Sequence, residues 1–442
     1  MNRLRRRTAD AARALGIGQP AGGGRPAPPH GGPNPSSPTE EPEEQRVTPL
    51  ELFFDLVFVF AITQVTGFVD AAPSWTRLSE GLAILAVLWI SWTGYAWLGN
   101  AAKSDDGFAR LTLLSAMGAT LIVSLAVPHA FDRDGWIFGI AFFALRALHI
   151  GAYVALARTQ HDAPLRRAIL RLGGTELPAA ALLIAAAAFD GAPRAAFWIA
   201  ALLVDYGVGA VVTMRAPSGV TGWHIEPRHL AERYNAFVII ALGESVVSVG
   251  VGVAGVPLDI SVVGAALLGL GTAAALWWAH FDLLAIMAAQ RLRGAPLRQQ
   301  VEIARDVYTL LHLPLVGGIV VFAMGLRRSL LDVDARLDVV PAVALLGGVA
   351  LYLLALTAVK WRSLGSIRLL RPLTAVAILA ILPAALAVPA LAALGMVTAA
   401  AWLPIAVELI RQPDARRRAR LEAMSPSPVA RDTTFDGAPR RP

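Results

Sequence analysis

Cysteine is absent from this chain of 442 residues, which excludes disulfides, thiolate metal sites and cysteine nucleophiles. Charge is scarce as well, because Asp, Glu, Lys and Arg make up only 16% of the residues, against about 25% in soluble domains. The sequence contains neither the Walker motif G-x-x-x-x-G-K-[ST] nor a G-x-S-x-G elbow. These absences argue against ATP hydrolysis and acyl transfer.

What remains is strongly apolar: 56% of the residues are hydrophobic, against roughly 45–50% in soluble domains. Apolar segments recur at about the 20 residues that a helix needs to cross a bilayer. We therefore predict an all-α, polytopic transmembrane helix bundle of about 12 spans. The predicted spans are 49–70, 79–99, 108–130, 135–157, 168–189, 194–214, 231–254, 260–288, 304–326, 339–359, 370–388 and 390–410. Pro383 and Pro389 leave open whether 370–410 is one kinked helix or two spans.

The two ends differ from this apolar centre. Residues 1–46 contain an arginine-rich start, a Gly/Pro/Ser-rich run and four glutamates, without the apolar run that follows the arginines of a secretory signal. We predict a disordered cytoplasmic tail for 1–46, a transmembrane domain for 47–411 and a basic, disordered cytoplasmic tail for 412–442. The alternative for the first tail is a basic arm that touches anionic lipid.

Basic residues between the predicted spans alternate in number. Loops on the side of the N-terminus carry most of them, whereas the other side has only Arg77, Arg133, Arg194, Arg327, Arg328 and Arg336. The positive-inside rule then places both termini in the cytoplasm of a multi-pass cell-membrane protein. The net charge of +7 is spread over these loops, which suits an anionic membrane surface better than nucleic acid. The expected partners are the lipid bilayer and a small solute or ion. The sequence indicates no oligomeric state and no cofactor.

The stretch from Thr48 to Thr66 is a helix start followed by an apolar run. Thr48 fits the N-cap position and Glu51 completes a capping box. Glu51 and Asp55 are four residues apart and share a helix face. Because an unpaired carboxylate is costly in lipid, a partner or a water-filled cavity must face Asp55. Helix capping is the simpler interpretation of Glu51.

This stretch also carries a resemblance. The run Glu51-Leu-Phe-Phe-Asp-Leu-Val-Phe-Val-Phe-Ala61 and the run Glu232-Arg-Tyr-Asn-Ala-Phe-Val-Ile-Ile-Ala-Leu-Gly-Glu-Ser245 are similar to the two strong motifs of the bacterial low temperature requirement A family. Leu276-Trp-Trp-Ala-His-Phe-Asp282 and Tyr308-Thr-Leu-Leu-His-Leu-Pro-Leu-Val-Gly317 fit it too. The resemblance implies a polytopic membrane protein named for a growth phenotype, and implies no reaction.

The two halves of the predicted bundle resemble each other when spans one to three are laid on spans seven to nine. The aligned pairs are Phe54-Asp55 with Tyr234-Asn235, Gln64 with Glu244, Leu88-Trp89 with Leu276-Trp277, and Arg110 with Arg305. Six spans per half predict a 6+6 parallel repeat, as in some secondary transporters. Accidental alignment of aromatic-rich helices is the alternative.

Polar residues within the spans are the candidates for chemistry. Arg146, His149 and Tyr153 are spaced i, i+3 and i+7, which places them on one face of a helix. The same spacing recurs in Arg305, Tyr308 and His312, and His280, Asp282, Glu176 and Asp205 lie in other spans. Each also has a structural interpretation: Arg146 fits a counter-ion for Asp55, Asp205 or Glu244, and the aromatic residues fit packing roles.

Glu244 is the strongest functional candidate. It lies 12 residues into its predicted span, about 18 Å along a helix, which is near the bilayer middle. An acid at that depth suggests function by default. Arg233 is three turns away, too far to pair with it, and we interpret Glu232 and Arg233 as first-turn and interfacial residues.

Three classes of function remain open. The first is a secondary transporter or ion-coupled permease, in which Glu244 and Asp55 exchange a proton, His280, Asp282 and His312 line a cavity, and Arg146 or Arg305 neutralises a carboxylate. The second is an intramembrane metal enzyme using His280, Asp282, His312 and Glu244, although no local ligand pair supports it. The third is a non-catalytic membrane component for envelope or cold-stress adaptation.

Overall fold

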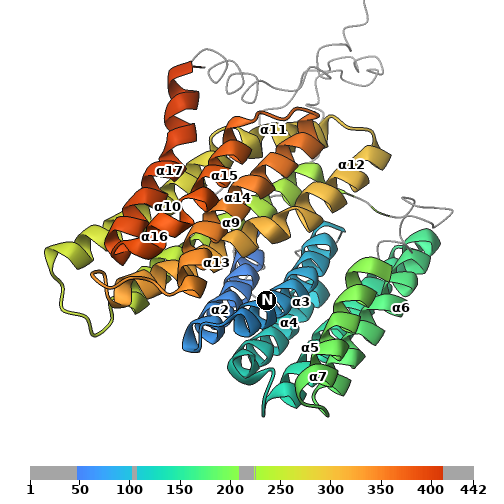
Figure 1. Ribbon diagram of the computed structural model, residues 1–442. Helices are drawn as coiled ribbons and strands as arrows, with labels where there is room; N and C mark the ends of the chain where they lie inside the picture. Colours follow the sequence, from blue (N-terminus) through green and yellow to red (C-terminus); the bar gives the residue numbers. More distant parts are fainter. Residues whose placement is uncertain (1–46, 102–106, 209–222, 224, 412–442) are drawn as a thin grey trace, which may run out of the picture. The chain divides into compact units, whose positions relative to one another are not determined.

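The computed structural model describes residues 47–101, 107–208, 223 and 225–411, and nearly all of them are helical (Figure 1). Within these ranges the only β-type pairing is an isolated bridge between Arg336 and Pro389. The predicted all-α class is therefore confirmed. The predicted tails, 1–46 and 412–442, lie outside the described residues.

The first half of the bundle runs from Pro49 to Val208. Its helices are α2 (Pro49–Ala71), α3 (Trp75–Ala101), α4 (Gly107–Ala126) with the 3-10 turn η1 (Val127–His129), α5 (Gly135–Thr159), α6 (Ala163–Ala186), and α7 (Gly191–Leu202) continued by the π-helix η2 (Leu203–Val208). Local signals set several boundaries. Asp162, for example, caps α6 by accepting the Leu165 N–H at 2.8 Å.

The second half runs from Pro227 to Arg411. Its helices are α9 (Pro227–Gly252), α10 (Ile260–Phe281), α11 (Leu284–Arg293), α12 (Leu297–Ile303) continued by the π-helix η3 (Ala304–Leu310), α13 (His312–Leu331), α14 (Val339–Leu364), α15 (Leu370–Ala380), α16 (Leu382–Ala387) and α17 (Ala390–Arg411). Gly365, with a φ of +65°, ends α14 in the left-handed conformation that favours glycine.

Eleven of the described helical segments are long and apolar enough to cross a membrane. They include both 370–387 and 390–410, so the last predicted region supplies two candidate spans rather than one kinked helix. The sixth predicted span, 194–214, is represented by α7 and η2 up to Val208, and its remainder lies outside the described residues.

The direction of the helices supports a sixth crossing there. Glu51 near the start of α2 contacts His229 and Arg233 near the start of α9, and Thr63 further along α2 contacts Glu244 further along α9. α2 and α9 therefore run in the same direction. An odd number of crossings must separate two such spans, and α3 to α6 supply four. α7 with η2 is the element available for the fifth.

Helix packing follows the same order in both halves. In the first half α2 packs on α3 and α4, α4 on α5, α5 on α6 and α6 on α7. In the second half α9 packs on α10 and α13, α13 on α14, α14 on α15 and α15 on α17. This correspondence supports the 6+6 repeat. Between the halves, α2 packs on α9 and α13, and Figure 1 shows it between these helices and α4.

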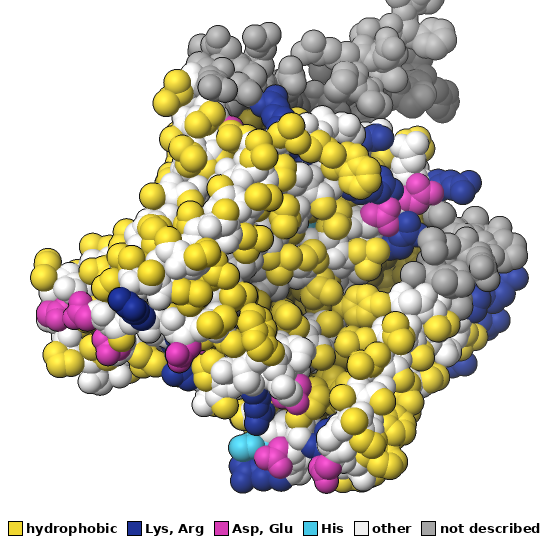
Figure 2. Space-filling view, viewed as in Figure 1, with side chains coloured by type: hydrophobic (Ala, Val, Ile, Leu, Met, Phe, Trp, Pro, Cys, Tyr) yellow, Lys and Arg dark blue, Asp and Glu magenta, His cyan; other side chains and the backbone are white. Residues whose placement is uncertain are grey.

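The outer surface suits lipid. Large apolar side chains lie exposed on many helices, among them Leu111 on α4, Ile140 on α5 and Val376 on α15. Figure 2 shows hydrophobic side chains over most of the visible face, with Lys, Arg, Asp and Glu gathered toward its margins. Contiguous exposed apolar surface of this extent marks a membrane protein.

Candidate functional site

The first polar cluster lies where α2 and α9 begin. The Thr48 N–H donates to Glu51 Oε2 at 3.0 Å and the Glu51 N–H donates to Thr48 Oγ1 at 3.3 Å, which confirms the capping box. Glu51 does more than cap its helix. Arg233 Nη1 donates to its Oε1 at 3.0 Å, and His229 Nε2 lies 3.1 Å from its Oε2.

Asp55, one turn along α2, binds the same guanidinium. Its Oδ1 accepts from Arg233 Nη2 at 3.3 Å and from the Trp92 indole N–H at 2.7 Å. Arg233 is therefore the charged partner that we expected for the buried Asp55 carboxylate. The interpretation of Arg233 as an interfacial residue is wrong, because its side chain is 0% exposed between two carboxylates. We call Glu51, Asp55, His229 and Arg233 the Arg233 network.

Neighbouring groups fix this network in place. Asn100 Nδ2 lies 3.3 Å from His229 Nδ1, so the ring accepts there and its Nε2–H faces Glu51. A Cβ at Gly99 would lie 2.6 Å from both Arg233 Nη1 and Glu51 Oε1. Only glycine leaves room at this point of α3 for the ion pair. Glu51 and Asp55 share the Arg233 guanidinium.

Glu244 lies apart from this network, also between α2 and α9. The Thr63 hydroxyl donates to its Oε2 and the Ser248 hydroxyl approaches its Oε1 at 3.4 Å. Thr66, one turn beyond Thr63, donates to the Ile62 carbonyl oxygen and lies close enough to influence the same carboxyl. Glu244 is 2% exposed, and no basic side chain among the described residues lies within ion-pair distance of it. We call Thr63, Thr66, Glu244 and Ser248 the Glu244 site.

Glu244 is less deep than its predicted span implied. α9 begins at Pro227 and ends at Gly252, so Glu244 lies eight residues from its end, or about 12 Å by the helical rise. Thr63 likewise lies eight residues before the end of α2 at Ala71. The site therefore lies within both spanning helices, nearer to the ends of α2 and α9 than to their starts.

A third cluster joins the far ends of α2 and α13. Asp70 Oδ2 lies 3.0 Å from Arg327 Nε, and Asp70 Oδ1 lies 2.6 Å from Arg328 Nε. Arg328 also donates to the Asp70 carbonyl oxygen. Together, Asp70, Arg327 and Arg328 form the Asp70 cluster. It joins the two halves at the opposite end of α2 from the Arg233 network.

A further cluster, confined to the first half, consists of Arg146, His149, Glu176 and Asp205, and we call it the Arg146 cluster. Arg146 Nη2 lies 2.7 Å from Asp205 Oδ1 and 3.4 Å from Glu176 Oε1, while His149 Nδ1 lies 3.2 Å from Glu176 Oε2. Of the three predicted partners of Arg146, the structure therefore selects Asp205. Tyr153 packs edge-on against His149, which keeps the predicted shared face.

His280, Tyr308 and His312 meet in the second half. His280 Nε2 lies 3.1 Å from Asn235 Oδ1, the His280 and His312 rings are 5.9 Å apart, and Tyr308 stacks on His312 at 5.4 Å. The offsets that align Asp55 with Asn235 and Trp89 with Trp277 also align Trp92 with His280. The pairs Asp55–Trp92 and Asn235–His280 are thus equivalent hydrogen bonds, a further sign of the repeat.

Comparison with known proteins agrees with this arrangement. The family model described as bacterial low temperature requirement A protein matches residues 46–406. The chain belongs to this family. A similar relative, an uncharacterized protein RA0937 of Rhizobium meliloti (strain 1021), is 28% identical over 71% of this chain and 77% of its own length. No solved structure matches.

The motifs that resemble the low temperature requirement A family meet in the structure. Glu51 and Asp55 come from the first motif, and Arg233 comes from the second. Together they make the Arg233 network, and Glu244 closes the second motif a further three turns along α9. Sequence analysis missed Arg233 and His229 as site residues, although the adjacent Glu-Arg-Tyr run of the second motif was a signal for them.

Two candidate residues of this low temperature requirement A protein lie away from the others. Arg305 is 31% exposed and pairs with Asp306 at 2.7 Å, because η3 is a π-helix and its wider turn separates Arg305 from Tyr308 and His312. Asp282 is the C-cap of α10. Arg146 and Arg305 each pair with a carboxylate, but these are Asp205, Glu176 and Asp306 rather than Asp55 or Glu244.

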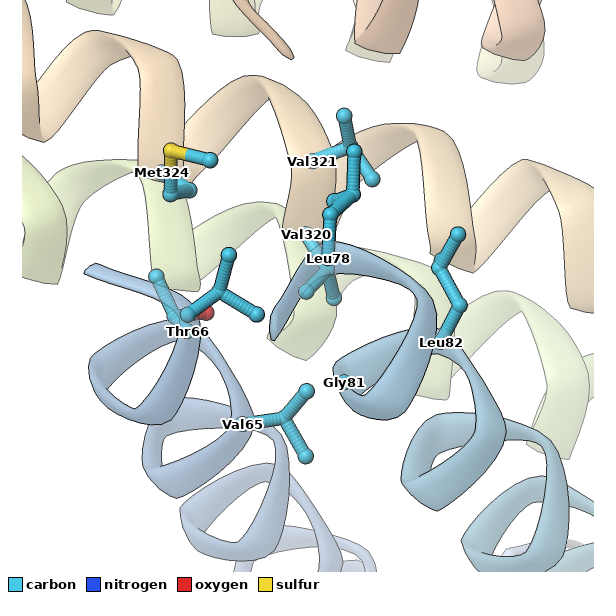
Figure 3. A pocket seen from close by; sticks show the side chains of 9 residues that line it. Val65, Thr66, Leu78, Gly81, Leu82, Val320, Val321 and Met324 are labelled. Carbon is cyan, nitrogen blue, oxygen red and sulfur yellow. The ribbon is translucent and has the colours of Figure 1, made fainter. Parts of the chain in front are cut away.

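The metal-enzyme hypothesis receives no geometric support. Within the described ranges, no three His, Asp or Glu side chains are grouped so that they could hold a metal ion. A small cavity between α2, α3 and α13, shown in Figure 3, has room for about one water molecule and is lined mainly by apolar side chains such as Val65, Leu78 and Met324. Thr66 is its polar member, which places the cavity beside the Glu244 site.

Proposed function

We propose that this protein is an ion-coupled secondary transporter whose coupling ion binds at Glu244. One observation carries the proposal: Glu244 is a buried carboxyl that contacts hydroxyl groups, whereas Glu51, Asp55, Glu176 and Asp205 each have a basic partner. A charged group in hydrocarbon is costly without a partner. Glu244 therefore requires a proton or a cation, and exchanging that ion is the elementary step of a coupled transporter.

The position of Glu244 between the halves supports this function. Thr63 belongs to the first half and Glu244 to the second, so a movement between halves changes the surroundings of the carboxyl. The Arg233 network joins the halves at one end of α2, and the Asp70 cluster joins them at the other. Alternating access needs contacts at both ends that open in turn, and these clusters are suited to that role.

The Asp70 cluster also offers a way to release the ion. Arg327 Nη1 lies 4.0 Å from the position of a Cβ on Gly67, one turn beyond Thr63 on α2. When Asp70 and Arg327 separate, the guanidinium is therefore close enough to turn toward Glu244 and neutralise it. In the orientation with both termini in the cytoplasm, the Asp70 cluster is the outer contact and the Arg233 network the inner one.

Thiol labelling tests this proposal, and the cysteine-free chain makes it direct. Ser248→Cys places a thiol beside Glu244. A membrane-impermeant thiosulfonate is applied to right-side-out and inside-out vesicles. We expect Asp70→Asn to increase labelling from outside and Glu51→Gln to increase it from inside, because each opens one end. Thr374→Cys, a buried hydroxyl position on α15, is the control and stays unlabelled in all backgrounds.

Labelling of Ser248→Cys that does not respond to either opening variant would contradict alternating access. In that case the buried ion pairs specify helix packing only, and the non-transporting membrane component becomes the better function. The Arg146 cluster and the Arg233 network would then be structural ion pairs of the bundle.

A further inference from the structure

The Glu244 site contains more oxygen atoms than are required to bind a proton. The site holds five: two from the Glu244 carboxyl, one each from Thr63 and Ser248, which contact that carboxyl, and one from Thr66, which lies near it. A proton can be held by the carboxyl alone. Three hydroxyl groups from consecutive turns of two helices supply the kind of shell that a dehydrated metal cation requires.

The hydroxyl protons are partly committed elsewhere. Thr63 Oγ1 lies 3.2 Å from the Val59 carbonyl oxygen, and Thr66 Oγ1 lies 3.3 Å from the Ile62 carbonyl oxygen, each in the preceding turn. A hydroxyl has one proton. In this structure Thr63 also has Glu244 Oε2 as an acceptor. When a cation occupies the site, Thr63 donates to the Val59 carbonyl instead, as Thr66 donates to Ile62, and both hydroxyls then present lone pairs to the cation.

Charge and donor type limit which cation fits. The site has one carboxylate and no nitrogen or sulfur ligand, so it suits a hard ion that prefers oxygen. One negative charge is balanced by a monovalent ion. The basic group that acts on Glu244 is Arg327, which is engaged by Asp70.

We propose that Thr63, Thr66, Glu244 and Ser248 form a Na⁺ site. This inference deepens the proposed function by naming the coupling ion. It rests on that function for the coupling to transport, while Na⁺ binding itself can be measured without any transport.

The experiment measures binding of ²²Na⁺ to the detergent-purified full-length protein, and its thermal stability in NaCl against KCl and choline chloride at equal ionic strength. We expect Na⁺ alone to raise the melting temperature. Thr66→Val keeps the carboxylate and removes one ligand, so we expect it to weaken Na⁺ binding by at least the roughly tenfold that losing even an outer-shell partner costs a metal site. Glu244→Gln abolishes binding.

Thr374→Val is the matched control, because Thr374 is also buried and its hydroxyl donates to the carbonyl of the preceding turn, at Leu370. It keeps full Na⁺ affinity. Equal melting temperatures in the three salts, or equal Na⁺ affinity in Thr66→Val and Thr374→Val, overturn the Na⁺ site. A separate outcome identifies a proton as the ion: the melting temperature depends on pH, and this dependence disappears in Glu244→Gln. The transporter proposal then stands and the Na⁺ proposal fails. Ser248→Ala replaces Glu244→Gln if that variant does not fold.

Discussion

Arg233 is the residue on which the contact between α2 and α9 depends. Its guanidinium donates to Glu51, to Asp55 and to the Tyr95 carbonyl oxygen at 3.3 Å, with no part of the side chain exposed. Removing one partner of a buried ion pair leaves an uncompensated charge, which costs more than the pair contributes. Loss of Arg233 would leave two buried carboxylates, Glu51 and Asp55, without their shared guanidinium.

We therefore expect Arg233→Ala to lower the free energy of unfolding by about 3–5 kcal/mol. Arg228→Ala is the control, one turn earlier on α9, where Arg228 pairs with Glu232 at 2.8 Å and both side chains are partly exposed. That pair is worth about 0–1 kcal/mol. Denaturant titration of the purified protein measures both variants. Similar losses in the two would show that the Arg233 network is not a principal contact.

Sequence reasoning reached one side of this contact and missed the other. The capping box and the need for a partner at Asp55 were predictable from local spacing and the cost of charge in lipid. Arg233 was not, because the span was expected to start at 231, which puts Arg233 at the membrane surface. α9 starts at Pro227, so Arg233 lies in its second turn, where the neighbouring helices bury it.

At the level of elements, the backbones of α13 and α14 approach each other closely at two glycines. A Cβ on Gly348 would lie 2.3 Å from the Phe322 nitrogen, and one on Gly325 would lie 2.3 Å from the Leu345 nitrogen. Small residues let membrane helices approach in this way, because packing rather than hydrophobic exclusion holds them together. The close contact holds α13, which carries Arg327 and Arg328, firmly within the second half.

Gly348→Ala should separate these helices. We expect a loss of about 1–3 kcal/mol in unfolding free energy, the usual cost of overpacking. Gly347→Ala is the control, since a Cβ there meets only the Val343 side chain, at 3.8 Å. Alanine also favours helix, so the control should be neutral or slightly stabilising. Equal melting temperatures for the two variants would contradict the role of Gly348.

The π-helix η3 shows where element-level prediction fails. The i, i+3, i+7 spacing of Arg305, Tyr308 and His312 predicts a shared face only for an α-helix. η3 has more residues per turn, so Tyr308 and His312 lie buried while Arg305 turns toward Asp306. Nothing in the local sequence distinguishes a π-turn from an α-turn, since both keep the same apolar composition.

For the whole molecule, the number and order of spans were largely predictable, because each crossing needs a long apolar run that leaves a clear mark in the sequence. The pairing of helices was not, since it depends on contacts such as Glu51–Arg233 that join distant segments. Proline positions alone could not show whether residues 370–410 form one kinked helix or two. In the structure a break between α16 and α17 divides this region.

The orientation of the bundle gives a prediction at this scale. The cytoplasmic N-terminus that the basic loops predict would place Ala72, between α2 and α3, outside the cell and Leu369, between α14 and α15, inside it. In the cysteine-free chain, we expect an impermeant thiol reagent to label Ala72→Cys in intact cells and Leu369→Cys only after permeabilisation. Both residues are exposed. The reverse labelling pattern would show that the bundle has the opposite orientation. Labelling of both variants in intact cells would contradict the number of spans.

The pairing of α2 with α9 also has a consequence in time. Glu51 and Asp55 precede Arg233 by 182 and 178 residues. At synthesis rates of roughly 5–20 residues per second, the base that pairs with them is made roughly 10–35 s after they are. A ribosome that has completed only the first half has therefore delivered two acids to the membrane before their base exists. The bundle can close around α2 only once α9 has been inserted beside it.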